Sequence, residues 1–152
     1  MAADSSIIVK WFKRGEEFEE EALRLRDDTL SGAVRLIISE WVYLEVVRAL
    51  VKVGLPDEKI KEAYETLREM SELGFIEAIP ISRLLDEAKK LEIRLRLYAS
   101  DAVNLASALL NSIDILTEDR HLLRGSVRSF MEERGLKILQ LKELYKNHQG
   151  EI

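Results

Sequence analysis

Residues 34–53 read VRLIISEWVYLEVVRALVKV and indicate the fold class. The run 34–38 is apolar and partly β-branched, which is typical of a buried strand. Ser39 stands where a helix N-cap is expected, and the strongly apolar stretch 40–53 predicts a largely buried helix. Gly54 and Pro56 then end that helix and open the next one.

Strands and helices are expected to alternate on both sides of this stretch. The predicted strands are 2–12, which runs into a turn, followed by 34–38, 75–79, 113–117 and 137–141. The predicted helices are 16–28, 40–53, 57–73, 82–97, 100–111 with Ser100 as its cap, 126–134, and a short closing helix. This order predicts an α/β protein whose mostly parallel sheet of about five strands is covered on both faces.

The composition predicts one globular domain, residues 1–146, followed by a short tail, 147–152, that is the only part expected to be disordered. The chain has 152 residues, of which 47% are hydrophobic and 34% charged. The absence of cysteine excludes disulfides and thiolate chemistry and favours the cytoplasm. The N-terminus does not resemble an export signal, and Glu45, Arg48 and Lys52 interrupt the most apolar segment, so no membrane span is expected.

The net charge of −5 argues against a protein that grips long nucleic acids through a broad basic face. It does not exclude a nuclease, because a cluster of acids that binds divalent cations would itself make the formal charge negative.

Two carboxylates in the first third of the chain are candidate metal ligands. Asp4 lies in or just after the first predicted strand, where it is either a turn residue or a ligand at the carboxyl end of the sheet. Glu45 lies among apolar residues, so its charge needs a metal or a partner such as Arg48. Glu40 lies in the first turn of the same helix, where the helix dipole alone explains an acid, and it is the weaker candidate.

Two more acids lie in the last third. Asp101 begins an apolar helix, where the helix dipole is again the simple explanation, but Asp101, Asn104 and Ser107 share one stripe of that helix. This polar line favours a lined site over a cap. Asp119 follows the fourth predicted strand, two residues after Thr117, in a stretch that is equally compatible with a plain turn.

In sequence order, the four segments DSSII, EWVYLEV, SDAVNLA and LTED together resemble the PIN-domain family, and within it the VapC-like toxin ribonucleases. The similarity runs from Asp4 to about Leu141. On this resemblance the four family acids correspond to Asp4, Glu45, Asp101 and Asp119, with hydroxyl groups from Ser5 or Ser6 and from Thr117 beside them. The sequence departs from the family in a very short first strand and in Glu118, which could supply an extra ligand.

The resemblance implies a three-layer α/β/α sandwich with the acids at one edge of the sheet. It also implies Mg²⁺- or Mn²⁺-dependent cleavage of single-stranded RNA that leaves 5′-phosphate and 3′-hydroxyl ends. The implied partners are the RNA substrate, a small cognate antitoxin and a second copy of the chain in a homodimer.

The residue chemistry agrees with this resemblance. Carboxylates without cysteine or a histidine cluster suit Mg²⁺ or Mn²⁺ rather than Zn²⁺, and His121 and His148 are expected at the surface. The residues expected to support the metal ligands are Ser5, Ser6, Asn104, Thr117 and Glu118. The candidates for RNA phosphate contacts are Arg120 first, then Lys10 and Arg14, with Lys13, Arg94, Arg96 and Arg124 as further cations.

Three alternatives stay open at this point. The chain could be a PIN-type RNA-processing nuclease without an antitoxin, or a catalytically silent binding protein of this fold. A phosphoacceptor receiver domain would also have an acidic pocket on a parallel sheet, but it requires a lysine at the carboxyl end of the last strand. Here Lys137 begins that strand.

Overall fold

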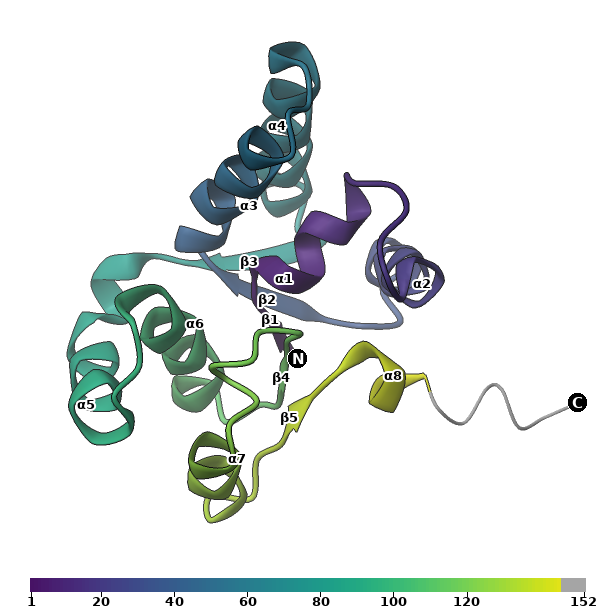
Figure 1. Ribbon diagram of the computed structural model, residues 1–152. Helices are drawn as coiled ribbons and strands as arrows, with labels where there is room; N and C mark the ends of the chain where they lie inside the picture. Colours follow the sequence, from purple (N-terminus) through teal and green to yellow (C-terminus); the bar gives the residue numbers. More distant parts are fainter. Residues whose placement is uncertain (146–152) are drawn as a thin grey trace, which may run out of the picture.

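The computed structural model describes residues 1–145 and contains one parallel sheet between two layers of helices (Figure 1). Its strands are β1 (Ala2–Ala3), β2 (Leu36–Ser39), β3 (Ile76–Ile79), β4 (Ile115–Leu116) and β5 (Ile138–Leu139). They lie in the order β3-β2-β1-β4-β5, and every pair is parallel. The predicted three-layer α/β/α fold with five strands is confirmed.

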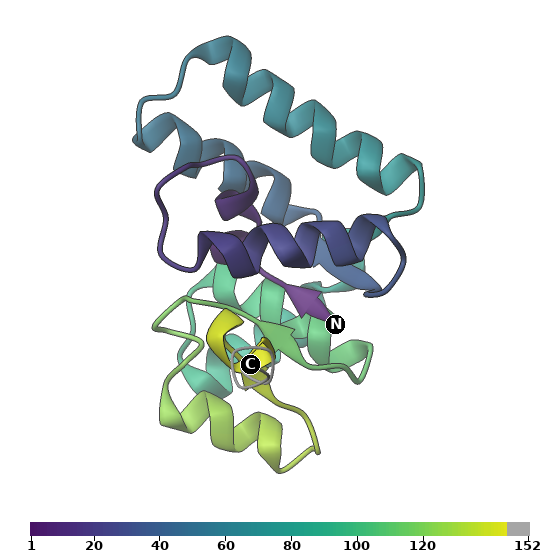
Figure 2. The ribbon, with the colours of Figure 1, turned by 90° about the vertical axis from the view of Figure 1, so that its right-hand side faces the viewer.

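The helices cover both faces of this sheet (Figure 2). The first layer holds α1 (Ser5–Ile8), η1 (Val9–Trp11), α2 (Glu19–Leu30), α3 (Trp41–Lys52), α4 (Asp57–Glu72) and α8 (Leu141–Leu144). The second layer holds α5 (Leu85–Leu95), preceded by η2 (Ile81–Arg83), and also α6 (Ala99–Leu110) and α7 (Gly125–Glu132).

Alternate side chains of each strand point into two hydrophobic cores, one on each face of the sheet. Ala3, Ile38 and Leu116 pack under the first layer, whereas their neighbours Ala2, Ile37 and Ile115 pack under the second. Successive strand side chains point to opposite faces, so a sheet covered on both sides needs apolar residues at every position. All four residues of β2 are buried, as this requires.

The N-terminal prediction was wrong beyond residue 4. Instead of an extended strand over 2–12, the chain has a two-residue strand followed at once by α1 and η1. The side chain of Asp4 accepts a hydrogen bond from the backbone N–H of Ser6 and so acts as the N-cap of α1. Ile7 and Ile8 are fully buried, and this packing overrides the strand preference of β-branched residues.

Two predicted caps were also wrong. Ser39 is the last residue of β2, and α3 begins at Trp41 after Glu40. The Ser39 hydroxyl is bonded elsewhere, to the Asn104 side chain at 2.7 Å, and is not a helix cap. Ser100 lies inside the first turn of α6, which starts one residue earlier at Ala99.

Helix α3 is less buried than its composition predicts. Val42, Val46 and Leu50 are fully buried, but Trp41 and Leu44 are 39% and 56% exposed. Val51 of the same helix is 48% exposed.

None of the helices within residues 1–145 is long and apolar enough to cross a membrane. The predicted tail, residues 147–152, lies outside the described residues.

Candidate active site

The candidate site lies where the sheet changes direction. From β1 the chain proceeds to β2 and β3 on one side, whereas β4 and β5 lie on the other side of β1. Ligands of open α/β sheets bind beyond the carboxyl ends of the strands at such a switch point. Asp4 directly follows β1, and Thr117 and Asp119 follow β4, so both segments deliver polar side chains to this position.

Asp4 is held rigidly at the centre of the site. It is 3% exposed, and its Oδ1 accepts hydrogen bonds from the backbone N–H of Ser6, at 3.0 Å, and from the Ser6 hydroxyl. Its Oδ2 accepts from the Thr117 hydroxyl, which in turn accepts from the Asp119 N–H at 2.9 Å. The Ser6 hydroxyl also accepts from the N–H of Glu118 at 2.8 Å. These bonds tie the ends of β1 and β4 together around one carboxylate.

Glu45 enters from α3 and is oriented by α6. The side-chain amide of Asn104 donates to Glu45 Oε1 at 2.9 Å, while its carbonyl oxygen accepts from the Ser39 hydroxyl. Asn104 is 2% exposed and Ser39 is fully buried. This chain of bonds explains the buried polar residue on α6 and fixes the direction of the carboxylate.

Asp101 and Asp119 complete the group of acids. Asp101 lies in the first turn of α6 and is 6% exposed. Asp119 Oδ1 accepts a hydrogen bond from the backbone N–H of His121 at 2.7 Å, which orders the loop after β4.

The four acids lie close enough for charges among them to raise the pKa values of Asp4, Glu45 and Asp101. Burial raises the pKa of Asp4 to about 7, against the hydrogen bonds from Ser6 and Thr117, and the charges of Glu45 and Asp119 raise it further. Burial also raises the pKa of Asp101 to about 6, with Asp119 adding to the effect. The pKa of Glu45 is raised first by burial and then by the charges of Asp101 and Asp119.

This donor set fits a hard divalent cation. All four side chains offer oxygen atoms, and three of them have raised pKa values because burial and mutual repulsion oppose their charges. Within residues 1–145, no three acidic or histidine side chains stand in the spacing of a preformed metal site. Closing the acids around a cation therefore requires them to draw together from these positions.

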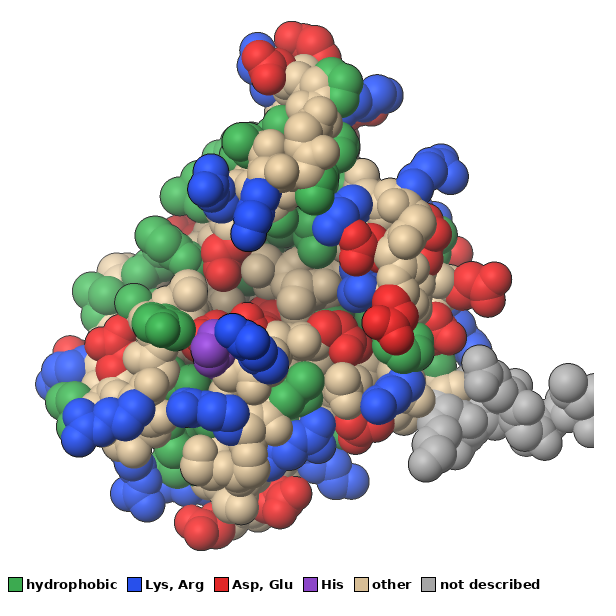
Figure 3. Space-filling model, viewed as in Figure 1, with side chains coloured by type: hydrophobic (Ala, Val, Ile, Leu, Met, Phe, Trp, Pro, Cys, Tyr) green, Lys and Arg blue, Asp and Glu red, His purple; other side chains and the backbone are tan. Residues whose placement is uncertain are grey.

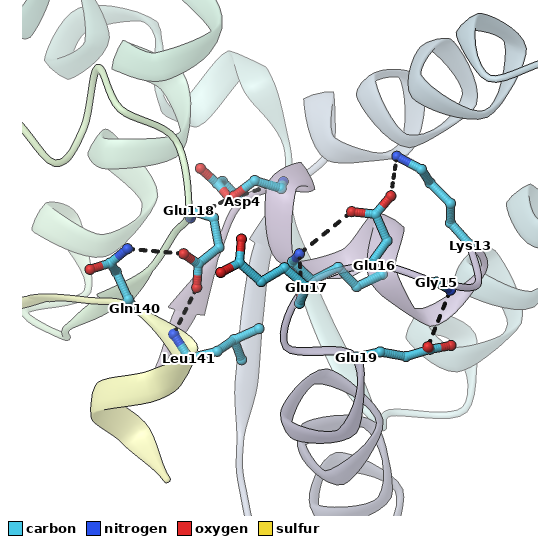
Figure 4. A network of polar contacts seen from close by, with 11 residues as sticks. Asp4, Lys13, Gly15, Glu16, Glu17, Glu19, Glu118, Gln140 and Leu141 are labelled. Carbon is cyan, nitrogen blue, oxygen red and sulfur yellow. Dashed lines mark hydrogen bonds and ion pairs between the residues drawn. The ribbon is translucent and has the colours of Figure 1, made fainter. Parts of the chain in front are cut away.

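Glu118 has a different setting from the other acids (Figure 4). One carboxylate oxygen accepts from the backbone N–H of Leu141 at 2.9 Å and the other from the Gln140 side chain at 3.0 Å. Both contacts hold the start of α8 beside β4. The extra-ligand role predicted for Glu118 would require its carboxylate to give up these bonds.

The predicted RNA-contacting cations differ in their exposure and in the contacts that they already make within the protein. Arg120 and Arg14 are exposed. Lys10 is only 7% exposed, and its ammonium donates to the carbonyl of Glu17 at 2.7 Å and lies 3.7 Å from Glu16. Arg124 donates to the carbonyls of Leu95 and His121. Lys10 and Arg124 therefore have structural contacts that a surface cation would lack.

Two contributors were not anticipated as site residues. Ser39 was interpreted as a cap, and His121 as a surface residue. The His121 ring stacks edge-on against Tyr98 at 5.3 Å, and its charge lowers the pKa of Asp101 against the effect of burial. Its place two residues after Asp119 is the sequence signal that could have pointed to it.

Comparisons with known proteins bear on the family and the fold of this chain. The family model described as "PIN domain" matches residues 1–126, a stretch that contains all four acids. A crystal structure titled "FitAcB from Neisseria gonorrhoeae" is similar with a TM-score of 0.55 and 16% identity, over 92% of this chain and 96% of that one. Among curated proteins no sequence matches. The family match covers well over half of the chain, and the chain therefore belongs to the PIN-domain family.

Proposed function

We propose that this protein is a divalent-metal-dependent endoribonuclease that cleaves single-stranded RNA, and that it is the toxin of a type II toxin–antitoxin pair. The observation that carries the proposal is the meeting of four carboxylates from β1, α3, α6 and the β4 loop at the switch point of the sheet. Membership of the PIN-domain family supports nuclease chemistry at this place.

Asp4, Glu45, Asp101 and Asp119 would hold Mg²⁺ or Mn²⁺. When bound, such an ion activates water and neutralises the charge that develops on the phosphate. Ser6 and Thr117 orient both oxygens of Asp4, and Asn104 orients Glu45, so these two carboxylates have only a short adjustment to make when a cation binds. The resemblance to the family implies that hydrolysis would leave a 5′-phosphate and a 3′-hydroxyl.

Cleavage of labelled single-stranded RNA by purified protein tests the proposal. Mg²⁺ or Mn²⁺ should support cleavage and EDTA should abolish it. Asp101→Asn and Asp119→Asn should each reduce turnover by orders of magnitude, because they remove charge from the cation site. Glu40→Gln is the matched control, since it neutralises an exposed acid at the start of α3. Equal rates in EDTA, or in both aspartate variants, would refute the assignment.

The proposed antitoxin would inhibit by offering an Arg, Lys or acidic side chain to the acidic site while an apolar helix docks in a nearby groove. Coexpression with the small protein encoded by the neighbouring gene tests this partner, which should copurify and block cleavage. Activity that no neighbour-encoded protein inhibits would favour an RNA-processing nuclease of the same family. The receiver alternative is not favoured, because the residue that follows β5 is Gln140 rather than lysine.

The proposed homodimer would use the exposed apolar side chains of α3. Trp41, Leu44 and Val51 lie three and seven residues apart on that helix, and all three are exposed. Figure 3 shows hydrophobic side chains gathered on the side of the molecule where α3 and α5 lie. A dimer is expected in light scattering, and Leu44→Glu should dissociate it. Leu30→Glu, at an exposed apolar residue of α2, is the control.

A further inference from the structure

A pocket of about 490 Å³ lies at the C-terminal end of η1, between η1 and the loop after it, α2 and the first half of α4. Five of its thirteen lining residues are Lys or Arg, and two are Glu. In a chain with a net charge of −5, such a concentration of cations in one hollow is unusual. Figure 3 shows Lys and Arg side chains gathered above the central acidic region of the same face.

The cations reach this pocket from three separate elements. Arg14 lies in the loop after η1, Arg26 on α2 and Lys59 on α4. Within residues 1–145 Arg14 has no ion pair or side-chain hydrogen bond. Lys59 has only an exposed pair with Glu62 at 3.5 Å, and Arg26 has one with the exposed Asp27 at 3.1 Å. Exposed pairs of this kind are weak and exchange easily with another anion. The other two cations of the pocket, Lys10 and Lys13, already pair with Glu16.

A second, independent feature of the pocket is an unsatisfied donor. Trp11 lines the pocket and is 7% exposed, and its indole N–H is buried without an acceptor. It is the only buried side-chain nitrogen or oxygen of the described chain in this condition. Buried donors are nearly always paired, so this N–H lacks an acceptor that an anion in the cationic hollow would supply once the atoms that cover the nitrogen move aside.

We infer that this pocket binds a phosphate group of the RNA substrate, with Arg14, Arg26 and Lys59 neutralising it and the Trp11 indole N–H as a donor. The inference rests on the proposed function and adds a second contact for the same strand. Residues 5–9 of α1 and η1 lie between Asp4 and Lys10, the first residue that lines the pocket, a distance of about 9 Å at helical rise. This separation allows one RNA strand to reach both places.

Two measurements on a short single-stranded oligoribonucleotide, made in EDTA so that it is not cut, test the inference. The first compares Lys59→Gln with Lys61→Gln, which makes the same charge change on the same helix at nearly equal exposure but outside the pocket. Lys59→Gln and Arg14→Gln should each weaken binding about fivefold and reduce the salt dependence by about 0.7 in log–log slope. Lys61→Gln should do neither.

The second measurement follows the indole N–H resonance of Trp11 in a Trp41→Phe background, where Trp11 is the only tryptophan. RNA should move this resonance downfield as the N–H gains an acceptor, whereas poly-L-glutamate should not. Equal affinities of Lys59→Gln and Lys61→Gln, or an unmoved resonance, would overturn the inference. A response to poly-L-glutamate alone would also overturn it and assign the pocket to an acidic peptide.

The proposed function can fail separately from this inference. If wild-type protein cuts RNA with Mg²⁺ while Lys59→Gln and Lys61→Gln bind the oligoribonucleotide equally well, the pocket assignment is wrong but the proposed nuclease activity is supported. If RNA occupies the pocket but no divalent cation supports cleavage, the nuclease falls and the pocket stands.

Discussion

Neutralising Asp4 should stabilise the metal-free protein increasingly as the pH rises. Burial raises the pKa of this carboxyl from 3.8 to about 7 in the folded chain, whereas the unfolded chain keeps an ordinary value. Between these values the folded protein holds a proton that the unfolded protein has lost. Wild-type stability therefore falls as the pH rises through this window, and the loss is complete above about pH 7.

The size of the effect follows from the same two values. From pH 5 to pH 8, linkage gives a loss of about 2–3 kcal/mol in the unfolding free energy of wild type, a term that Asp4→Asn lacks. The variant carries a penalty that does not depend on pH. Its amide cannot accept the Thr117 hydroxyl proton, which costs about 1–3 kcal/mol.

Urea unfolding of both proteins in EDTA, at several pH values between 5 and 8, measures the difference directly. The critical quantity is the change of this stability difference with pH, because the cost of the lost Thr117 hydrogen bond is the same at every pH. Asp86→Asn removes an exposed carboxylate of α5 and controls for net charge. Saturating Mg²⁺ should flatten the wild-type slope, since the cation binds only the folded form. A difference between wild type and Asp4→Asn that stays constant with pH would refute the burial argument.

Other predictions follow from single contacts. In EDTA at pH 8, Asp101→Asn should melt at the same temperature as wild type or higher, because burial raises the pKa of Asp101 to about 6 and so opposes its charge. Metal should raise the melting midpoint of this variant less than that of wild type. Strong destabilisation in EDTA, with equal metal-induced shifts in both proteins, would make Asp101 a structural residue. Glu118→Ala should lower the free energy of unfolding by about 1–2 kcal/mol, because the hydrogen bond from the Leu141 N–H is lost, while metal-dependent cleavage persists. Loss of metal affinity at unchanged stability would instead make Glu118 a ligand. Asn104→Leu should lower turnover more than it raises KM, because it frees Glu45, and unchanged turnover would contradict that positioning role.

The sequence predicts the fold more reliably than the details of the site. The apolar patterns in residues 34–53 and 57–73 predict a strand and two helices, and the structure has β2, α3 and α4 there, although α3 exposes more apolar side chains than its composition predicts. The first strand was predicted too long because Ile7 and Ile8 favour strands by composition. Their helical conformation depends on the Asp4 cap and on the core beneath them, and neither is a local property of the segment.

Proximity among the acids could be predicted only where topology forces it. Asp4 and Asp119 follow adjacent parallel strands, so their meeting is implied by the strand order. The polar line on α6 indicated a lined site, and Asn104 indeed reaches Glu45. Ser107 on the same stripe bonds instead to the backbone carbonyl of Asn104, within its own helix. Glu118, next to Asp119, contacts α8, because neighbouring residues after a strand leave in different directions.

Asp4 has two roles in this fold, and they arise from the shortness of β1. Because β1 consists of Ala2 and Ala3 alone and ends directly before Asp4, the carboxylate lies at the carboxyl edge of the sheet and also caps α1 through the N–H of Ser6. Asn at position 4 keeps the capping acceptor and removes the charge, whereas Ala removes both. The stability difference between Asp4→Asn and Asp4→Ala therefore contains the cap, about 1 kcal/mol, and the lost bond from the Ser6 hydroxyl. If the two variants unfolded at the same urea concentration at every pH, Asp4 would not be the residue that starts α1.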